Sequence, residues 1–178
     1  MTTIKKLQYE INHNFDEKNA RHFVNGFVSV LHCHHYSTLY AQLADDAELL
    51  DGKALLVSST QDVFYSVLKK YFQDNGISCL KQRIIVTEQY YSACGLGKLT
   101  VVSAGADSGD VILTRSHVDE GWIKKWGKRE KPVNFLTQGF IAAAFSSFFD
   151  LPSGSFEVVE NQSIVAGAEK SKFTVIRK

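Results

Sequence analysis

Proline and cysteine are scarce in this chain of 178 residues, and neither sign of charge is in excess. It holds two prolines and three cysteines, and 20 basic side chains nearly balance 19 acidic ones, for a net charge of +1. Few prolines together with 12 phenylalanines are typical of a packed globule, not of a linker or disordered tail. The near-zero net charge argues against a general nucleic-acid binder.

Long hydrophobic runs and disulfide spacing are also missing. No apolar run reaches the length of a membrane span, and the first residues lack the apolar segment of a signal peptide. The odd set of scattered cysteines (Cys33, Cys79, Cys94) favours a reduced, cytoplasmic setting over a secreted one. We therefore expect one domain over residues 1–178, with a core that buries roughly 70% of the unfolded surface.

Hydrophobic periodicity and turn signals predict an α+β fold with an antiparallel sheet packed against helices. The turn Asn25-Gly26 precedes the first predicted strand. Residues 1–24 carry no pattern that assigns them to an element. We predict helices over residues 38–50, 62–72, 78–93 and 133–149, and strands over the first half of 27–36 and over 99–103, 111–115, 155–160, 163–166 and 172–176.

The predicted helix over residues 133–149 is apolar nearly all round, which indicates a central, buried helix. Pro132 stands at its start, where the missing N–H costs nothing. Gly139 and Ala143 form a stripe of small residues. This stripe predicts that another element approaches the helix closely.

The last third of the chain carries a set of spaced motifs. They are Ser116, Pro132-Val133-Asn134-Phe135, Gly139-Phe140, Glu160-x-x-Ser163 and Ser171. On these motifs, residues 112–178 resemble the 4-vinyl reductase domain family, which includes the aromatic-sensing domains of phenol- and xylene-responsive transcription activators. More distantly they resemble the TRAPP vesicle-tethering subunits. The resemblance implies a small α+β domain, often a homodimer, with a pocket for a small hydrophobic ligand.

One feature of that family is altered here. The resemblance implies a zinc held by a cysteine at the start of the long helix, a glutamate, and two cysteines of the closing hairpin. The matching positions are Asn134, Glu160, Ser163 and Ser171. Thiolates make such a site bind zinc tightly, and hydroxyls and an amide do not replace them. We expect no zinc and no other cofactor at these residues, and hydrogen bonds among them instead.

A cluster of histidines forms the sharpest local feature: His32, Cys33, His34, His35 and Tyr36. On a strand His32 and His34 would share one face, whereas on a helix His32 and His35 would be neighbours. Either geometry could supply metal ligands or a proton-transfer pair, with His117 as a third partner and Glu88 or Asp119 as a carboxylate. The alternative is that these histidines only form hydrogen bonds in a half-buried strand, or orient a ligand.

Two tryptophans four residues apart, Trp122 and Trp126, would form one aromatic face on a helix. They either line a ligand pocket or pack against the sheet. The resemblance places residues 113–126 near a ligand pocket. The candidate ligand-binding residues are therefore His32, His34, His35, Tyr36, Ser116, His117, Trp122 and Trp126.

These observations leave two main functions open. The first is a ligand-binding or sensory domain for a small hydrophobic or aromatic molecule, without the family's zinc and without nucleic acid as a partner. The second is a small enzyme that uses the histidine cluster, with a metal on His32, His34 and His117 as one form of it. A third hypothesis is an interaction module that works through dimer contacts. No phosphate-binding loop or nucleophile elbow is present in the sequence.

Overall fold

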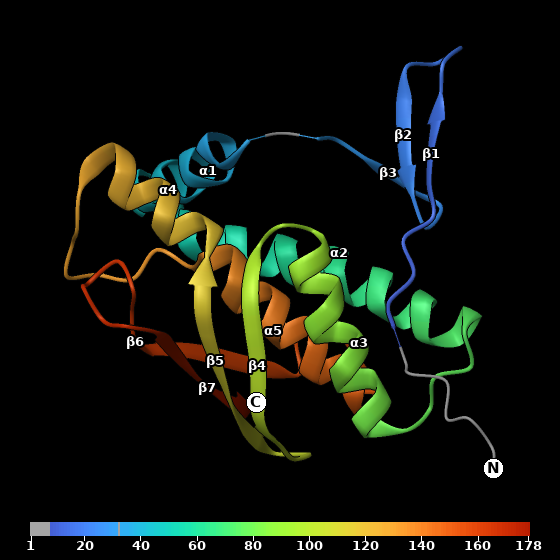
Figure 1. Cartoon of the computed structure of the whole chain (residues 1–178). Helices are drawn as coiled ribbons and strands as arrows, with labels where there is room; N and C mark the ends of the chain where they lie inside the picture. The colour runs from blue at the N-terminus through green and yellow to red at the C-terminus, as the bar shows by residue number, and fades with distance from the viewer. Residues whose placement is uncertain (1–7, 32) are drawn as a thin grey trace.

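The computed structural model describes residues 8–31 and 33–178, and Figure 1 shows its ribbon. In chain order the elements are β1 (His13–Asp16), β2 (Arg21–Val24), β3 (Phe27–Ser29), α1 (His34–Asp46), the 3-10 helix η1 (Glu48–Leu50), α2 (Gly52–Asp74), α3 (Leu80–Ala93), β4 (Gly97–Ala104), β5 (Ser108–Ser116), α4 (His117–Trp126), α5 (Phe135–Phe148), β6 (Phe156–Gln162) and β7 (Ser171–Arg177). The predicted α+β class with an antiparallel sheet is confirmed.

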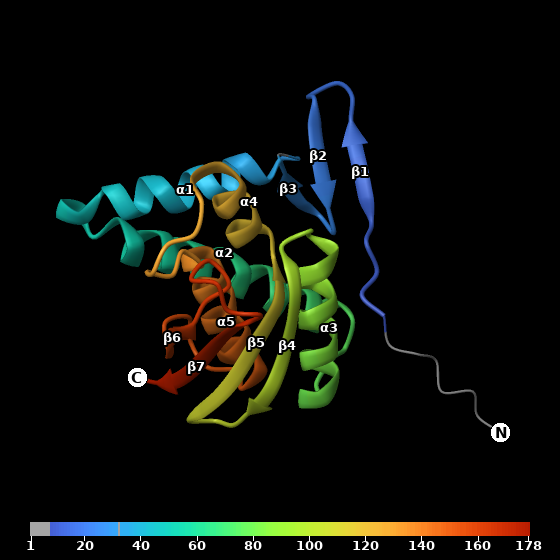
Figure 2. The same ribbon diagram turned by 60° about the vertical axis from the view of Figure 1, so that its left-hand side comes forward.

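The main sheet has the strand order β4-β5-β7-β6, and every neighbouring pair is antiparallel. Alternating burial along the strands turns one side of this sheet toward the helices, with Val111, Leu113, Phe173 and Val175 all buried in the core. Helix α5 packs against β6 and β7, and α2 packs along α5. The sheet and these two helices form successive layers (Figure 2).

Helix α5 is the buried centre that its sequence predicts. Phe140 and Phe145 are completely buried, and Gly139 faces α2. A Cβ atom on Gly139 would overlap the carbonyl oxygen of Val57 and lie 2.8 Å from the Cβ atom of Thr60. The predicted close approach at Gly139 is therefore confirmed, and the approaching element is α2.

One predicted helix is longer than expected, and one predicted strand is wrong. The helix predicted over residues 62–72 is confirmed but runs over Gly52–Asp74, because Gly52 begins α2 at a place where a Cβ atom would lie 2.7 Å from the Ala44 carbonyl oxygen. The strand predicted over 163–166 is a turn instead. The Ser163 carbonyl accepts the N–H of Ala166, and Gly167 has a φ of 98°, so the chain reverses there.

The N-terminal part forms a second, three-stranded sheet of order β1-β2-β3, which stands away from the main body (Figures 1 and 2). We call residues 8–31 the arm. The predicted turn at Asn25-Gly26 is confirmed: both residues have positive φ, and Val24 pairs with Phe27 across it. The strand that follows ends at Ser29, and His34, His35 and Tyr36 belong to α1, so this part of the histidine cluster starts a helix.

None of the helices in the described residues is long and apolar enough to span a bilayer.

The end of α5 is capped by a buried arginine on α3. The Arg83 Nη1 atom donates to the carbonyl oxygens of Ser147 and Phe148, at 2.9 and 3.0 Å, and pairs with the exposed Asp150 carboxylate at 2.9 Å. Its Nε atom donates to the Ile77 carbonyl at 3.2 Å. The guanidinium therefore satisfies carbonyls that the last turn of a helix leaves without intrahelical partners.

Replacing Arg83 by methionine keeps the aliphatic length and removes these donors. We expect the free energy of unfolding to fall by about 2 kcal/mol, because buried carbonyls lose charged donors. Urea denaturation followed by circular dichroism measures this change. Lys81→Met, on the exposed side of the same helix, is the control and should change the free energy of unfolding by less than about 0.5 kcal/mol. Equal small losses in both variants would contradict the capping role.

Candidate functional site

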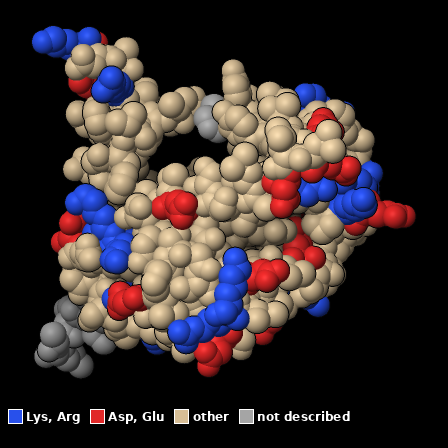
Figure 3. Space-filling model, turned by 180° about the vertical axis from the view of Figure 1, so that it is seen from behind, with Lys and Arg blue, Asp and Glu red and all other residues tan. Residues whose placement is uncertain are grey.

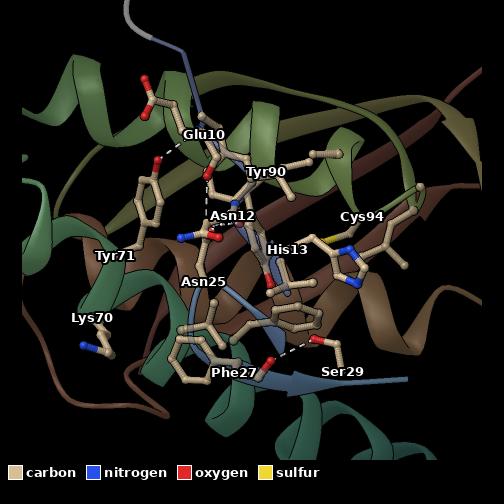
Figure 4. A pocket seen from close by; sticks show the side chains of 18 of the residues that line it. Glu10, Asn12, His13, Asn25, Phe27, Ser29, Lys70, Tyr71, Tyr90 and Cys94 are labelled. Carbon is tan, nitrogen blue, oxygen red and sulfur yellow. Dashed lines mark hydrogen bonds between the residues drawn. The ribbon is translucent and has the colours of Figure 1, made fainter. Parts of the chain in front are cut away.

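A hollow of about 920 Å³ lies between the arm, helices α2 and α3, and the starts of α4 and α5. Figure 3 shows the open space between the arm and the body, and Figure 4 shows the side chains around it. We call this hollow the arm pocket. Its apolar lining comes from distant parts of the chain and includes Ile11, Val24, Phe27, Val30, Leu31, Phe64, Val67, Ala93, Leu96 and Leu136.

Three tyrosines form an aromatic wall of the arm pocket (Tyr71 and Tyr90 are labelled in Figure 4). The ring of Tyr9 lies 4.8 Å from that of Tyr71 and 5.1 Å, edge-on, from that of Tyr90, measured between centroids. These distances and tilts are favourable for aromatic contacts. The wall joins the arm to α2 and α3.

The tyrosine hydroxyls are neutral hydrogen-bonding groups. Burial raises the pKa of Tyr9 and that of Tyr90 far above the ordinary value, so both phenols keep their protons. The Tyr9 hydroxyl accepts from Asn25 Nδ2 at 2.8 Å, and the Tyr71 hydroxyl accepts from the backbone N–H of Glu10 at 3.0 Å. Each of these two oxygens still has a proton of its own to donate.

Few charges reach the arm pocket, and they partly compensate one another. Lys70 and Asp74 on α2 form an exposed ion pair at 2.7 Å, and Glu10 is exposed. Cys94, at the end of α3, is exposed and lines the arm pocket, yet burial by protein atoms raises the pKa of its thiol. The neutral thiol is a poor nucleophile. The pocket therefore suits an uncharged molecule.

Hydrogen bonds hold the base of the arm on the helices. The backbone N–H of Tyr9 donates to Gln89 Oε1 on α3 at 2.6 Å. Within the arm, the N–H of Asn12 donates to Asn25 Oδ1 at 2.7 Å (Figure 4). The side chain of Asn25 thus links the segment before β1 to the turn after β2, and both segments contribute to the arm pocket.

The candidate residues of the histidine cluster lie around the start of α1, the helix that packs against α4. His32 lies outside the described residues. His34 and His35 begin α1, where His35 and Tyr36 are exposed, while Ser37 lines the arm pocket. No group of three or more His, Cys, Asp or Glu residues within 8–31 and 33–178 is placed to hold a metal ion. Metal binding that involves His32 remains a prediction.

The remaining candidates fall in two places. His117, at the start of α4, lines the arm pocket. Trp122 and Trp126 lie 4.7 Å apart between ring centroids and pack beside α1 and Arg129, away from the pocket lining. Trp122 is buried and Trp126 is half exposed. Ser116 belongs to a separate buried cluster.

The three tyrosines of the arm pocket are not among the candidate residues that the sequence predicts. Tyr71 and Tyr90 lie on predicted helices, but Tyr9 lies in the segment without a predicted element. The wall forms only when these three distant segments meet.

The positions that match the family's zinc ligands converge in a second place, buried under the start of α5. Asn134 precedes α5, Glu160 lies on β6 and Ser171 begins β7. Asn134 Nδ2 donates to Glu160 Oε1 at 2.9 Å and to Asp119 Oδ2 at 2.8 Å. Asn134 Oδ1 accepts from the Ser116 hydroxyl at 2.9 Å. One amide therefore joins two buried carboxylates and a serine.

Two carboxylates in this cluster share a nearly dry environment, because Asp119 is 0% and Glu160 8% exposed. Burial raises the pKa of Glu160 to about 7, and the nearby Asp119 adds to this, while the hydrogen bond from Asn134 acts against it. Burial also raises the pKa of Asp119. The cluster offers only oxygen atoms and an amide to a cation, and this donor set lacks the thiolates and imidazoles that hold structural zinc.

The class of this protein is defined by its fold and not by a sequence match. A scan against family models and a search of curated proteins both find no match. Among solved structures, the chain has the fold of the 4-vinyl reductase and TRAPP-like α+β domains.

Three solved structures illustrate this similarity. The phenol-responsive sensory domain of the transcription activator PoxR, solved with phenol, is 10% identical with a TM-score of 0.76, covering 93% of this chain and 84% of that one. A vinyl-4-reductase family protein from Methanocaldococcus jannaschii is 13% identical with a TM-score of 0.56, covering 84% of each chain. Subunit 3 of the trafficking protein particle complex from Naegleria fowleri, covalently bound to palmitic acid, is 10% identical with a TM-score of 0.53, covering 82% and 95%.

Proposed function

We propose that this protein binds a small, uncharged, largely apolar molecule in the arm pocket and acts as a ligand-binding or sensory domain. The observation that carries the proposal is the pocket itself: about 920 Å³, lined by aromatic and aliphatic side chains with neutral hydroxyls among them. Sites for small molecules are typically concave and apolar with a few polar groups that orient the ligand. The similarity to a sensory domain solved with phenol supports the same function.

The size of the arm pocket favours a ligand larger than a single ring. Pockets of roughly 300–1,000 Å³ commonly hold drug-sized molecules. The aromatic wall can contact a flat or extended apolar body, and the Tyr9 and Tyr71 hydroxyls can donate to a carbonyl or hydroxyl oxygen on it. A neutral molecule with an extended apolar part and one oxygen function is the class that fits.

We extend the proposal to the expectations from the sequence about zinc, cellular setting, partners and oligomeric state. The oxygen-and-amide cluster around Asn134 and Glu160 supports a protein that holds no zinc there. The three cysteines are free thiols, which supports a reducing, cytoplasmic setting. The balanced charge supports partners other than nucleic acid. We also propose that the protein works as a homodimer.

Filling the arm pocket with a bulky side chain should abolish ligand binding. In Val67→Trp the indole occupies space that the ligand needs, so we expect the dissociation constant of the neutral fluorophore N-phenyl-1-naphthylamine to rise at least tenfold. Fluorescence titration measures this, and native mass spectrometry of the purified protein shows whether a copurified ligand is retained. Val63→Trp, one turn earlier on α2 and outside the pocket lining, is the matched control. Equal affinity in the two variants would refute binding at this site.

A further inference from the structure

Two histidines on neighbouring strands of the arm lie in direct contact with each other. In the antiparallel register His13 on β1 lies opposite Val24 on β2. Because side chains alternate between the two faces of a sheet, His22, two residues before Val24, lies diagonal to His13 on the same face. We call His13 and His22 the imidazole pair. It belongs neither to the histidine cluster at the start of α1 nor to the buried cluster of carboxylates.

The two imidazole rings meet edge to edge through their nitrogens. His13 Nε2 and His22 Nδ1 are 2.8 Å apart, the ring planes differ by 19°, and the ring centroids are 5.0 Å apart. One ring therefore donates its N–H to the lone pair of the other. The ring of Phe15 packs against that of His22, with 4.5 Å between centroids. His13 is exposed and His22 half-buried, so solvent reaches the pair.

This geometry is close to that of two imidazoles on one metal ion. Neutral imidazole is a common ligand for late first-row metals. When the donor ring carries its proton on its other nitrogen, both facing nitrogens present lone pairs, and the pair neither gains nor loses a proton. Two metal–nitrogen bonds of about 2.0–2.1 Å at a tetrahedral angle place their nitrogens about 3.3 Å apart. A small rotation of the two side chains opens the pair from 2.8 Å to this spacing.

The surroundings of the imidazole pair select the class of ion. Within residues 8–31 and 33–178 no third His, Cys, Asp or Glu joins the two rings, so water completes the coordination. Nitrogen ligands favour Zn²⁺, Ni²⁺ and Cu²⁺, whereas Mg²⁺ and Ca²⁺ prefer carboxylate and carbonyl oxygens. A site with two protein ligands is open and exchanges its ion, unlike a closed structural site with four.

We propose that His13 and His22 bind a late first-row divalent cation of the Zn²⁺, Ni²⁺ and Cu²⁺ class, and that this ion links β1 to β2. None of the residues in β1, β2 and β3 is buried, and a small sheet without a packed face is only marginally stable in water. An ion that binds only the paired strands stabilises them. His13 also lines the arm pocket (labelled in Figure 4), so the ion steadies one wall of that pocket.

Isothermal titration calorimetry of the tag-free full chain with zinc sulfate at pH 7.5, after removal of metal with EDTA, tests the site. We expect His13→Gln and His22→Gln each to raise the dissociation constant for Zn²⁺ at least about tenfold, because one imidazole replaces a chelating pair. Magnesium sulfate should produce no binding heat. Zn²⁺ binding that both variants retain, or that only His34→Gln removes, overturns the proposal.

Asn14→Gln is the matched control for these variants. Asn14 follows His13 on β1 and is exposed, and its side chain lies on the opposite face of the strand. Its dissociation constant for Zn²⁺ should stay within twofold of that of the unmodified protein. Far-UV circular dichroism verifies that every variant is folded. His13→Cys, which replaces the imidazole by another zinc ligand, should regain the affinity that His13→Gln loses.

Nitrogen-15 NMR of the unmodified protein gives a readout that needs no variant. Zn²⁺ should shift the resonances of His13 Nε2 and His22 Nδ1. At a free concentration ten times the dissociation constant, it should slow amide hydrogen exchange in β1 and β2 about tenfold, because the bound ion suppresses opening of the strands. Unshifted ring nitrogens overturn the site, and unchanged exchange overturns the link between the strands. The metal site does not require the proposed function: a protein that binds Zn²⁺ here and no N-phenyl-1-naphthylamine retains the first and loses the second.

Discussion

Replacing Gly139 by valine is expected to lower the free energy of unfolding by more than about 4 kcal/mol and to leave little folded protein at 37 °C. Any side chain at this position overlaps the backbone of α2, because a Cβ atom would meet the Val57 carbonyl and lie 3.1 Å from the backbone nitrogen of Gln61. Backbone atoms of a helix cannot rotate away as a side-chain tip can. The two helices must separate, and the core around Phe140 loses its close packing.

Thermal unfolding followed by circular dichroism measures the loss, and Ser58→Val is its control. Ser58 lies on the exposed side of α2, so the control introduces the same β-branched side chain into a helix without a clash. It should cost less than about 0.7 kcal/mol. If Gly139→Val stays within 1 kcal/mol of the control, α2 and α5 do not pack as closely as described.

The parts of the fold that could be predicted are those whose sequence pattern is local. The apolar composition of helix α5 already indicates that it is buried. The hairpin of β4 and β5 is indicated by two strand-like segments on either side of a glycine-rich turn. The start of α2 was missed because Asp51-Gly52 has the composition of a break. In the structure Asp51 takes a left-handed conformation and the glycine fits against Ala44, a contact that no local pattern contains.

The arm pocket could not be predicted for a related reason. Its walls join residues far apart in the chain, such as Tyr9 and Tyr90, and the arm has no apolar periodicity because it has no core of its own. The buried cluster could be predicted more fully, because the resemblance aligns Asn134, Glu160 and Ser171 with the family's zinc ligands. It did not align Asp119, whose role depends on the first turn of α4 lying beside Asn134.

The buried cluster makes the protein less stable as the pH rises from about 4.5 to about 7. Glu160 has a pKa of about 7 in the folded state, because of its burial, against 4.5 as the ordinary value. Between these values the folded state holds a proton that the unfolded state has lost. The free energy of unfolding then falls by about 1.4 kcal/mol per pH unit, in total about 3 kcal/mol, and levels off above pH 7.

Urea denaturation at half-unit steps from pH 4.5 to 8.5 measures this slope, and Glu160→Gln isolates its source. Glutamine keeps the oxygen that accepts from Asn134 and cannot ionise, so this variant should lose most of the slope, keep only the part due to the raised pKa of Asp119, and be more stable than the unmodified protein at pH 8 by about 2–3 kcal/mol. Glu157→Gln, on the exposed side of the same strand, should retain the slope. A slope that is unchanged in Glu160→Gln would mean that Glu160 ionises as freely in the folded chain as in the unfolded one. Asp119, the other buried carboxylate of the cluster, would then be the source of the slope.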